Sequence, residues 1–336
     1  MIQTCKSEDY NWIFNNQNGE FCRWGKTKED DPEFSPIGPE ILDLEISTIC
    51  NGIDDKPCLH CYKSNNEFGK YMSFETFKII FSKMNKNLTQ IAFGIGNIDA
   101  NPDMWKIFQY CRDNNVIPNV TINGARMTPE YYKNLVKYCG AVAVSRYHDK
   151  NLCYNTVQEL YNRGLKQVNI HQIIAEESYD LCFELIDDVN TDKRLKNLYS
   201  VILLTLKQKG RGIYFTLVKT FDQYQKLVDY ALENNTRIGF DSCFAHIFME
   251  ATKNHPNFKQ FMEMLEPCES SVFSSYINVK GEYWHCSFIE GHPDWKGVDV
   301  LSCNNFVKDI WYGEECKKFR NLLLDTGRRC PLIMEE

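Results

Sequence analysis

Three cysteines lie close together in the stretch STICNGIDDKPCLHCYKSN, directly after the first strongly apolar segment. Seven residues separate Cys50 from Cys58, and two separate Cys58 from Cys61. Thiolates are soft ligands that favour zinc, copper(I) and iron–sulfur clusters. Three such ligands leave one position of a metal site open, which is typical of catalytic rather than structural sites. The spacing therefore predicts a catalytic metal centre on one loop.

The total number of cysteines supports metal binding rather than cross-linking. Fifteen of 336 residues are cysteine, about 4.5%, whereas disulfide scaffolds are short chains with roughly 8–10%. The N-terminus lacks the apolar core of a secretory signal, and the apolar run at 198–206 is far short of the ~20 residues that a membrane helix needs. We therefore expect a cytoplasmic protein with reduced thiols and no membrane partner.

The charge balance argues against one further class of partner. Lys and Arg number 38 and Asp and Glu number 45, which gives a net charge of −7. A nucleic-acid-binding surface needs a basic face, so we expect no nucleic-acid partner.

The pattern of apolar residues predicts the elements that position the cysteines. Short apolar strands alternate with amphipathic helices six times, which is typical of parallel strands with crossover helices. The site of such a fold lies at the carboxyl ends of the strands. The predicted strands are 41–47, 90–95, 119–123, 141–145, 167–174 and 200–206, and the helices are 73–84, 104–114, 129–138, 154–163, 179–189 and 221–233.

This pattern predicts an α/β fold, a partial (β/α)6 TIM-like barrel, over residues 41–236. Residues 1–40 are predicted to be an N-terminal hairpin, turning at Asn18-Gly19, and a linker. The alternation of strands and helices ends at residue 237, and residues 237–336 are predicted to form a small C-terminal α+β module with six of the cysteines. It contains a seventh strand near 238–244, a hairpin at Lys280-Gly281 and helices at 258–265 and 308–324.

The cysteine loop resembles that of the radical S-adenosylmethionine (SAM) enzymes, whose signature Cys-x3-Cys-x-aromatic-Cys follows the first barrel strand. This sequence departs from it twice. The first spacing is seven residues instead of three, and His60 stands where an aromatic residue is usual. A longer loop costs little entropy, and an aromatic residue, Tyr62, follows the last cysteine.

Later strand ends extend the resemblance. The family's Gly-Gly-Glu-Pro element, which binds the SAM amino group, is similar to FGIGNIDANPDMW, with Gly96 and Asn97 at the second Gly and the Glu. Asn97 keeps an acceptor but removes the charge. Asn123 matches the family's Thr-Asn-Gly, and Ser145 ends the fourth strand where a polar SAM contact is frequent. The resemblance implies that Tyr62, Gly96, Asn97, Asn123 and Ser145 contribute to SAM binding, although Asn97 and Ser145 have loop capping as the alternative.

The C-terminal module resembles SPASM/Twitch extensions, which carry auxiliary iron–sulfur clusters. Cys268, Gly281 and Cys286 fit the element Cys-x9–15-Gly-x4-Cys. The Cys-x2-Cys-x5-Cys-x3-Cys block of a second auxiliary cluster is absent. One auxiliary 4Fe–4S cluster is therefore expected. Its ligands are predicted to be Cys243, Cys268, Cys286 and Cys330, with Cys303 and Cys316 as substitutes.

The resemblance implies an oxidoreductase or maturase that uses two 4Fe–4S clusters and SAM. A cluster on Cys50, Cys58 and Cys61 would cleave SAM reductively to a 5′-deoxyadenosyl radical, which abstracts hydrogen from a peptide or protein substrate. An electron donor such as flavodoxin or ferredoxin is the implied partner. Asp241, beside Cys243, is the candidate catalytic base.

Three alternatives remain open at this point. The substrate could be a small molecule, because only about forty residues precede the first strand, which is short for a leader-peptide-binding domain. The protein could bind metal without catalysis. The three cysteines could form a zinc knuckle completed by His60 or another cysteine.

Overall fold

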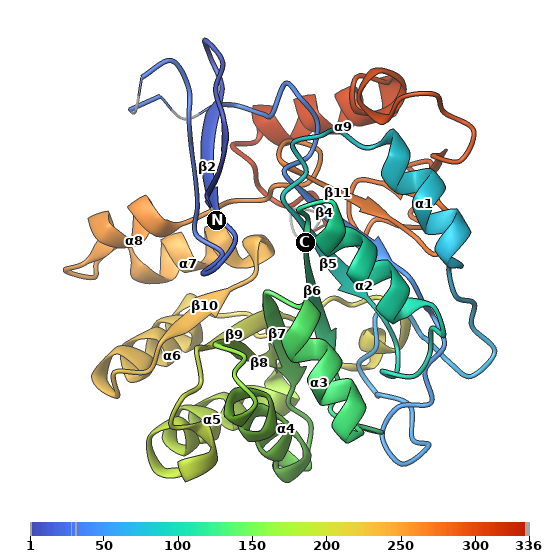
Figure 1. The fold of residues 1–336 in the computed structure, drawn as a ribbon. Coiled ribbons are helices and arrows are strands. Elements are labelled where there is room, and N and C mark those ends of the chain that lie inside the picture. Colours follow the sequence, from blue (N-terminus) through green and yellow to red (C-terminus); the bar gives the residue numbers. More distant parts are fainter. Residues whose placement is uncertain (1, 28, 31, 333–336) are drawn as a thin grey trace.

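Residues 2–27, 29–30 and 32–332 are described by the structure, a computed structural model in which one large sheet curves through the molecule (Figure 1). Its strand order is β10-β9-β8-β7-β6-β5-β4-β11-β12-β13, and all pairings from β10 to β11 are parallel. The strands are β4 (Ile41–Glu45), β5 (Gln90–Gly94), β6 (Ile117–Ile122), β7 (Ala141–Ser145), β8 (Gln167–Ile174), β9 (Ser200–Thr205), β10 (Ile238–Phe240), β11 (Ser274–Ile277), β12 (Glu282–Trp284) and β13 (Val298–Asp299).

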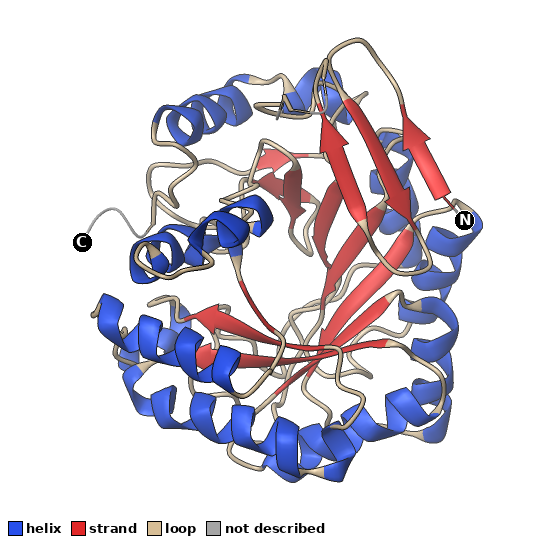
Figure 2. Ribbon diagram, turned by 90° about the vertical axis from the view of Figure 1, so that its left-hand side faces the viewer, coloured by secondary structure: helices blue, strands red, loops and turns tan. Residues whose placement is uncertain are grey.

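Helices cover the outer face of the curved sheet, one after each of its first six strands along the chain (Figure 2). Their starts follow ordinary capping chemistry: the side chain of Ser73 accepts a hydrogen bond from Thr76 N, and Thr128 caps a helix that begins with Pro129. None of the described helices is long and apolar enough to cross a membrane. The six helices are α1 (Phe74–Lys83), α2 (Met104–Asp113), α3 (Pro129–Tyr138), α4 (Lys150–Asn162), α5 (Tyr179–Thr191) and α6 (Phe221–Glu233).

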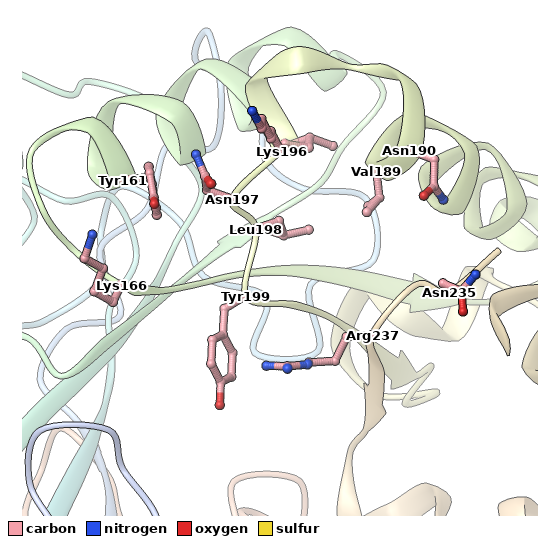
Figure 3. Close-up of a pocket in the computed structure, with 11 residues that line it drawn as sticks. Tyr161, Lys166, Val189, Asn190, Lys196, Asn197, Leu198, Tyr199, Asn235 and Arg237 are labelled. Atoms are coloured by element: carbon pink, nitrogen blue, oxygen red, sulfur yellow. The ribbon is translucent and has the colours of Figure 1, made fainter.

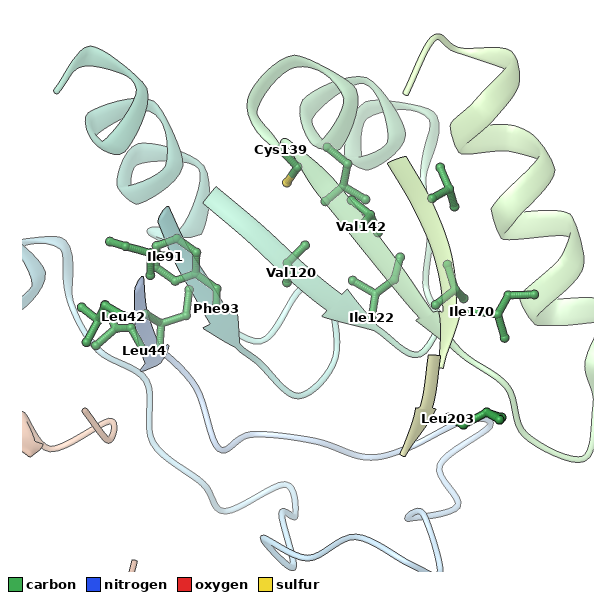
Figure 4. Packing of buried hydrophobic residues seen from close by; sticks show 14 of the residues in the cluster. Leu42, Leu44, Ile91, Phe93, Val120, Ile122, Cys139, Val142, Ile170 and Leu203 are labelled. Carbon is green, nitrogen blue, oxygen red and sulfur yellow. The ribbon is translucent and has the colours of Figure 1, made fainter. Parts of the chain in front are cut away.

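The core lies between these helices and the strands. Alternate strand residues point outward and are fully buried, as the side chains of Leu42, Leu44, Ile91 and Phe93 show in Figure 4. The other alternate residues point into the curve of the sheet. Asp43, between the buried Leu42 and Leu44, is exposed, so the concave side is not filled with side chains at that point. The predicted partial barrel is confirmed.

The C-terminal residues extend the same sheet. β11 pairs with β4 in parallel, placing Tyr276 opposite Asp43, and β12 returns antiparallel as the predicted hairpin. The short helices α7 (Ala245–Thr252) and α8 (Phe258–Met264) follow β10. The predicted final helix is divided. A π-helical turn spans Val307–Trp311, and α9 (Glu314–Asp325) begins after Gly313, whose extended backbone interrupts the helix.

The N-terminal segment is a three-stranded antiparallel sheet and not a single hairpin. It consists of β1 (Ile2–Cys5), β2 (Asn11–Asn15) and β3 (Phe21–Trp24), in the order β1-β2-β3. The β2–β3 turn is longer than the two-residue type that Asn18-Gly19 suggests. Asn15 N donates to Glu20 O at 2.9 Å, and Gly19 adopts the left-handed conformation with φ 71°. The residues around Asn18-Gly19 are all polar, so the sequence does not show whether the turn has two residues or more.

Arg23 on β3 joins this small sheet to the segment before β11. Its side chain is 8% exposed and forms ion pairs with Glu40 at 3.0 Å, Glu266 at 2.6 Å and Glu269 at 3.5 Å. The guanidinium group also stacks over the ring of Phe273, 3.5 Å from its centroid. Burial raises the pKa of Glu40 and of Glu269 to about 7, so these carboxylates depend on Arg23 for their charge.

Replacing Arg23 by Met should destabilise the protein by ~3–5 kcal/mol, because it leaves buried carboxylates without their cation. Urea unfolding followed by tryptophan fluorescence measures the change. Combining Arg23→Met with Glu40→Gln should recover part of the loss. A loss below ~1 kcal/mol for the single variant would show that the small sheet is not held by this ion pair.

Candidate metal centre

The three predicted ligands lie together on one loop. We call residues 46–66, which follow β4 at the carboxyl edge of the sheet, the cysteine loop. Cys50, Cys58 and Cys61 are each half-buried. Burial, followed by the proximity of Cys61, raises the pKa of Cys58 to about 11. Gly52 N donates to Cys50 Sγ at 3.4 Å, and an N–H bond to sulfur stabilises a thiolate ligand.

Arg211 holds the cysteine loop from the segment after β9. Its Nε donates to Cys58 O at 2.7 Å, and its terminal nitrogens donate to Asn65 O at 3.2 Å. Its backbone N donates to Cys61 O at 3.0 Å. A Cβ on the preceding Gly210 would lie 2.4 Å from Tyr62 O, so the two segments are in backbone contact. The turn that contains Arg211 is therefore in direct contact with the cysteine loop.

The segment after β5 packs against the other end of the cysteine loop. A Cβ on Gly96 would lie 1.8 Å from Ile49 O, so only glycine fits there. Asn97 is 2% exposed; its Oδ1 accepts from Asn51 N at 2.7 Å and its Nδ2 donates to Gly52 O at 2.8 Å. Both ends of the amide hold the loop backbone, which favours the capping alternative for Asn97 over direct contact with a ligand.

The ends of β6 and β7 bring two more predicted residues to this edge. Asn123 is buried, and its Oδ1 accepts from Ala125 N at 3.0 Å. Ser145 is half-buried and hydrogen-bonds to Tyr147. Burial, and then the nearby Cys58, raise the pKa of Tyr147. Tyr147 therefore lies directly over the cysteine loop.

His60 is engaged by aromatic rings. It stacks on Tyr147 with centroids 5.7 Å apart and meets Phe215 edge-on at 5.8 Å. Burial lowers the pKa of His60 to about 4. Within the described ranges, no three His, Cys, Asp or Glu side chains are arranged to hold one metal ion. The position of His60 thus offers no support for a zinc knuckle.

Tyr62 contacts the C-terminal module. Its hydroxyl donates to Ser287 Oγ at 3.2 Å, and its ring packs on Phe288 with centroids 4.5 Å apart. Burial raises the pKa of Tyr62. Because Ser287 and Phe288 directly follow Cys286, Tyr62 joins the cysteine loop to the second set of cysteines.

Cys243, Cys268, Cys286 and Cys330, here called the four-cysteine group, come together from distant parts of the sequence. Cys243 and Cys330 share a hydrogen bond, which lowers the pKa of Cys243 and raises that of Cys330. Burial, followed by the charge of Cys243, raises the pKa of Cys268 to about 11 and that of Cys286 to about 12. Each of the four thiols therefore lies within electrostatic range of the others.

The two substitute ligands lie elsewhere. Cys316 is buried beside Arg320, whose terminal nitrogen is 3.3 Å from its sulfur. The pKa of Cys303 is raised by burial and lowered by Lys83, and none of the four-cysteine group contributes to that shift. The structure thus groups the four first-choice cysteines and leaves both substitutes outside.

Asp241, the predicted catalytic base, forms an ion pair. Lys207 Nζ lies 3.1 Å from Asp241 Oδ2, and Thr205 Oγ1 donates to Asp241 Oδ1 at 3.1 Å. Burial alone would lower the pKa of Lys207, but Cys243 and Asp241 raise it overall. The pair lies between the ends of β9 and β10, against the four-cysteine group.

Sequence reasoning missed two groups that face the concave side of the sheet. Lys63 is bound by Glu45 at 3.0 Å, by the carboxylate of Glu290, and by Tyr276 through its hydroxyl at 2.9 Å. Asp43 has no hydrogen bond or ion pair with any described residue, and burial raises the pKa of its carboxyl to about 6 although water reaches the side chain. In β4, Asp43 and Glu45 alternate with apolar residues, and this pattern could have indicated that both carboxylates lie on the concave side.

An open cavity of about 420 Å³ lies at the other end of the barrel (Figure 3). Lys166, Tyr199 and Arg237 in its wall precede β8, β9 and β10, so it is at the amino ends of the strands. None of the predicted site residues lines it, and active sites of parallel α/β folds lie at the opposite edge. This cavity is separate from the candidate site.

No family model matches the sequence. The chain is 22% identical over 293 residues to the mycofactocin maturase MftC of Mycobacterium tuberculosis, covering 81% of this chain and 70% of MftC. SuiB of Streptococcus suis, solved bound to its precursor peptide SuiA, superposes with a TM-score of 0.69 at 14% identity, covering 94% of this chain and 90% of SuiB.

A second solved structure has the same fold. The protein anSMEcpe with bound AdoMet (SAM) superposes with a TM-score of 0.58 at 13% identity, covering 84% of this chain and 80% of anSMEcpe. SuiB has also been solved bound to S-adenosylmethionine. The chain thus resembles a maturase in sequence, and it shares its fold with proteins solved with SAM bound. The resemblance to radical SAM enzymes drawn from the motifs is thereby confirmed.

Replacing Asp43 by Asn should stabilise the protein near neutral pH. The pKa of about 6 in the folded state lies above the ordinary aspartate value of 3.8, so the folded state binds more protons between these values and its stability falls as pH rises through them. Asn removes that cost. Thermal unfolding should show a higher midpoint for Asp43→Asn than for wild type at neutral pH, converging near about pH 4.

The matched control is Asp9→Asn, which changes an exposed carboxylate and should leave the pH profile unchanged. Identical pH profiles for wild type and Asp43→Asn would contradict the raised pKa of the Asp43 carboxyl.

Proposed function

We propose that this protein is a radical SAM maturase that acts on a peptide or protein substrate. The observation that carries the proposal is the position of the two cysteine sets. The cysteine loop stands at the carboxyl edge of the parallel sheet, and the four-cysteine group contacts it through Tyr62, Ser287 and Phe288. A fold shared with proteins solved with SAM bound supports it.

The residues present fit a 4Fe–4S cluster on the cysteine loop. In such a cluster each thiolate binds a different iron, so the sulfurs need not converge on one ion. The half-buried positions of Cys50, Cys58 and Cys61 and the N–H bond from Gly52 to Cys50 Sγ suit three thiolates with one open iron site. Arg211 and Asn97 bind the backbone of the cysteine loop and so hold its three cysteines in place.

The four-cysteine group fits an auxiliary 4Fe–4S cluster. It has the four thiols that a fully ligated cluster needs, and they are mostly removed from water. We propose Tyr62, Gly96, Asn97, Asn123 and Ser145 as the residues that shape the SAM site, with Asn97 acting through the loop backbone.

When bound, these groups supply one-electron reductive cleavage of SAM and hydrogen abstraction by the 5′-deoxyadenosyl radical. The chain contributes position and the exclusion of water. Tyr147 and His60 form an aromatic cover beside Cys58. We propose that Asp241 accepts a proton from the substrate, and its ion pair with Lys207 holds the carboxylate in place.

The choice of a peptide substrate follows from the relatives. One is named a maturase, and another was solved with its precursor peptide. The concave side of the sheet offers Asp43, accessible and without a partner among the described residues, to a donor group of such a substrate. An electron donor of the flavodoxin or ferredoxin type completes the proposed system.

Anaerobically purified protein should be brown and contain roughly eight irons per chain, as expected for two 4Fe–4S clusters. Replacing Cys50, Cys58 and Cys61 by Ala should remove about half of the iron and abolish 5′-deoxyadenosine release with dithionite and SAM. Replacing Cys243 and Cys330 by Ala should remove the other half and spare that release. Iron analysis and chromatography measure both effects.

Cys22→Ser, which alters an exposed cysteine of β3, is the control and should retain all iron. A colourless protein loaded with zinc would refute the proposal and support the non-catalytic alternative. Turnover with a small molecule but with no peptide or protein tested would replace the peptide substrate with the small-molecule alternative.

A further inference from the structure

Lys207 is a buried cation between the two cysteine sets. Lys207 lies two residues after the end of β9, and its side chain is only 7% exposed. Its Nζ donates to Thr205 O at 3.2 Å and lies 3.1 Å from Asp241 Oδ2. Its charge also acts on Cys243 of the four-cysteine group and lowers the pKa of that thiol. One ammonium group therefore contacts a carboxylate and lies within electrostatic range of a candidate ligand sulfur.

An aromatic wall closes the remaining side of Lys207. Its Nζ lies 5.1 Å from the ring centroid of Phe288, and the same ring packs against Tyr62, the residue after Cys61. An aromatic face attracts a cation while it excludes water from it. The Phe288 ring thus screens the ammonium group from solvent and also contacts Tyr62 of the cysteine loop.

Asp241 opposes the charge of Lys207 at the same place. Its Oδ1 accepts from Thr205 Oγ1 at 3.1 Å, so a second donor fixes the carboxylate. The Asp241 carboxylate raises the pKa of Cys243, whereas Lys207 lowers it. The pair therefore places a positive and a negative charge, both fixed in position, within electrostatic range of Cys243.

We propose that Lys207 raises the reduction potential of the cluster held by the four-cysteine group, and that Asp241 lowers it. This inference rests on the proposed function, since it requires the auxiliary cluster. Reduction adds one electron to a site that is already negatively charged, and the potential of an iron–sulfur cluster depends on net charge and hydrogen bonds to its sulfurs. A nearby cation stabilises the reduced form more than the oxidised form, and a carboxylate does the reverse.

The test is a redox titration of full-length protein in which only the auxiliary cluster remains. The background variant carries Cys50→Ala, Cys58→Ala and Cys61→Ala, and the electron comes from dithionite. Lys207→Met keeps the length of the side chain and removes its charge, and Asp241→Asn keeps its shape. Electron paramagnetic resonance at set potentials gives the midpoint, and iron analysis confirms that the cluster is retained.

The expected result is a lower midpoint for Lys207→Met, a higher one for Asp241→Asn, and a midpoint for Lys207→Arg close to the parent value. Lys106→Met, which removes a 68% exposed cation on α2, is the control and should leave the midpoint unchanged. Opposite shifts distinguish an electrostatic role from a structural one, because damage to the site would lower iron content in both variants.

Unchanged midpoints, or shifts of the same sign with iron retained, would overturn the proposal. Loss of iron in both variants would replace it with a purely structural role for the pair. If the background variant holds no cluster and wild type holds only about four irons, the assignment of an auxiliary cluster to the four-cysteine group is wrong. Should the background variant fail to fold, the same titration on wild-type protein, fitted with two clusters, gives the same comparison.

Discussion

The candidate site depends on the parallel alignment of the strands. Because β4 to β10 all run in one direction, the segments that follow them emerge at one edge of the sheet. β11 joins this arrangement by pairing in parallel with β4, so the hairpin after it carries Cys286 to the same region. An antiparallel β11 would send that hairpin to the other edge, and the two cysteine sets would lie far apart.

Buried cations organise the region that these segments form. Arg211 holds carbonyl groups of the cysteine loop, and Lys209 holds Phe288 O at 3.0 Å in the loop after Cys286. Lys63 is neutralised by Glu45 and Glu290, and Lys207 by Asp241. Cations removed from water are costly unless paired, so each marks a contact between segments distant in sequence. The cysteine loop and the segments around it are thus held together by cations paired with carboxylates or backbone carbonyls.

Much of the fold could be predicted from the sequence because its signals are local. Alternating and helical apolar patterns depend on neighbouring residues, and α3, α6, β7 and β8 have the predicted bounds. The three-stranded N-terminal sheet was not predicted, because β1 is short and half-exposed and has no apolar pattern. The break before α9 was missed, because one glycine in a helical pattern does not show whether the helix continues.

The sequence by itself determined the chemistry of the cysteine loop, since three thiols within twelve residues must lie on one loop whatever the fold. It also determined the order of elements and the edge at which the loop stands. Tertiary structure alone decided that Cys243, Cys268, Cys286 and Cys330 meet while Cys303 and Cys316 do not. It also decided that Asn97 binds loop backbone, that Asp241 pairs with Lys207, and that Asp43 has no partner among the described residues. These outcomes depend on sheet pairing and packing between residues up to hundreds of positions apart, and no local pattern encodes such distances.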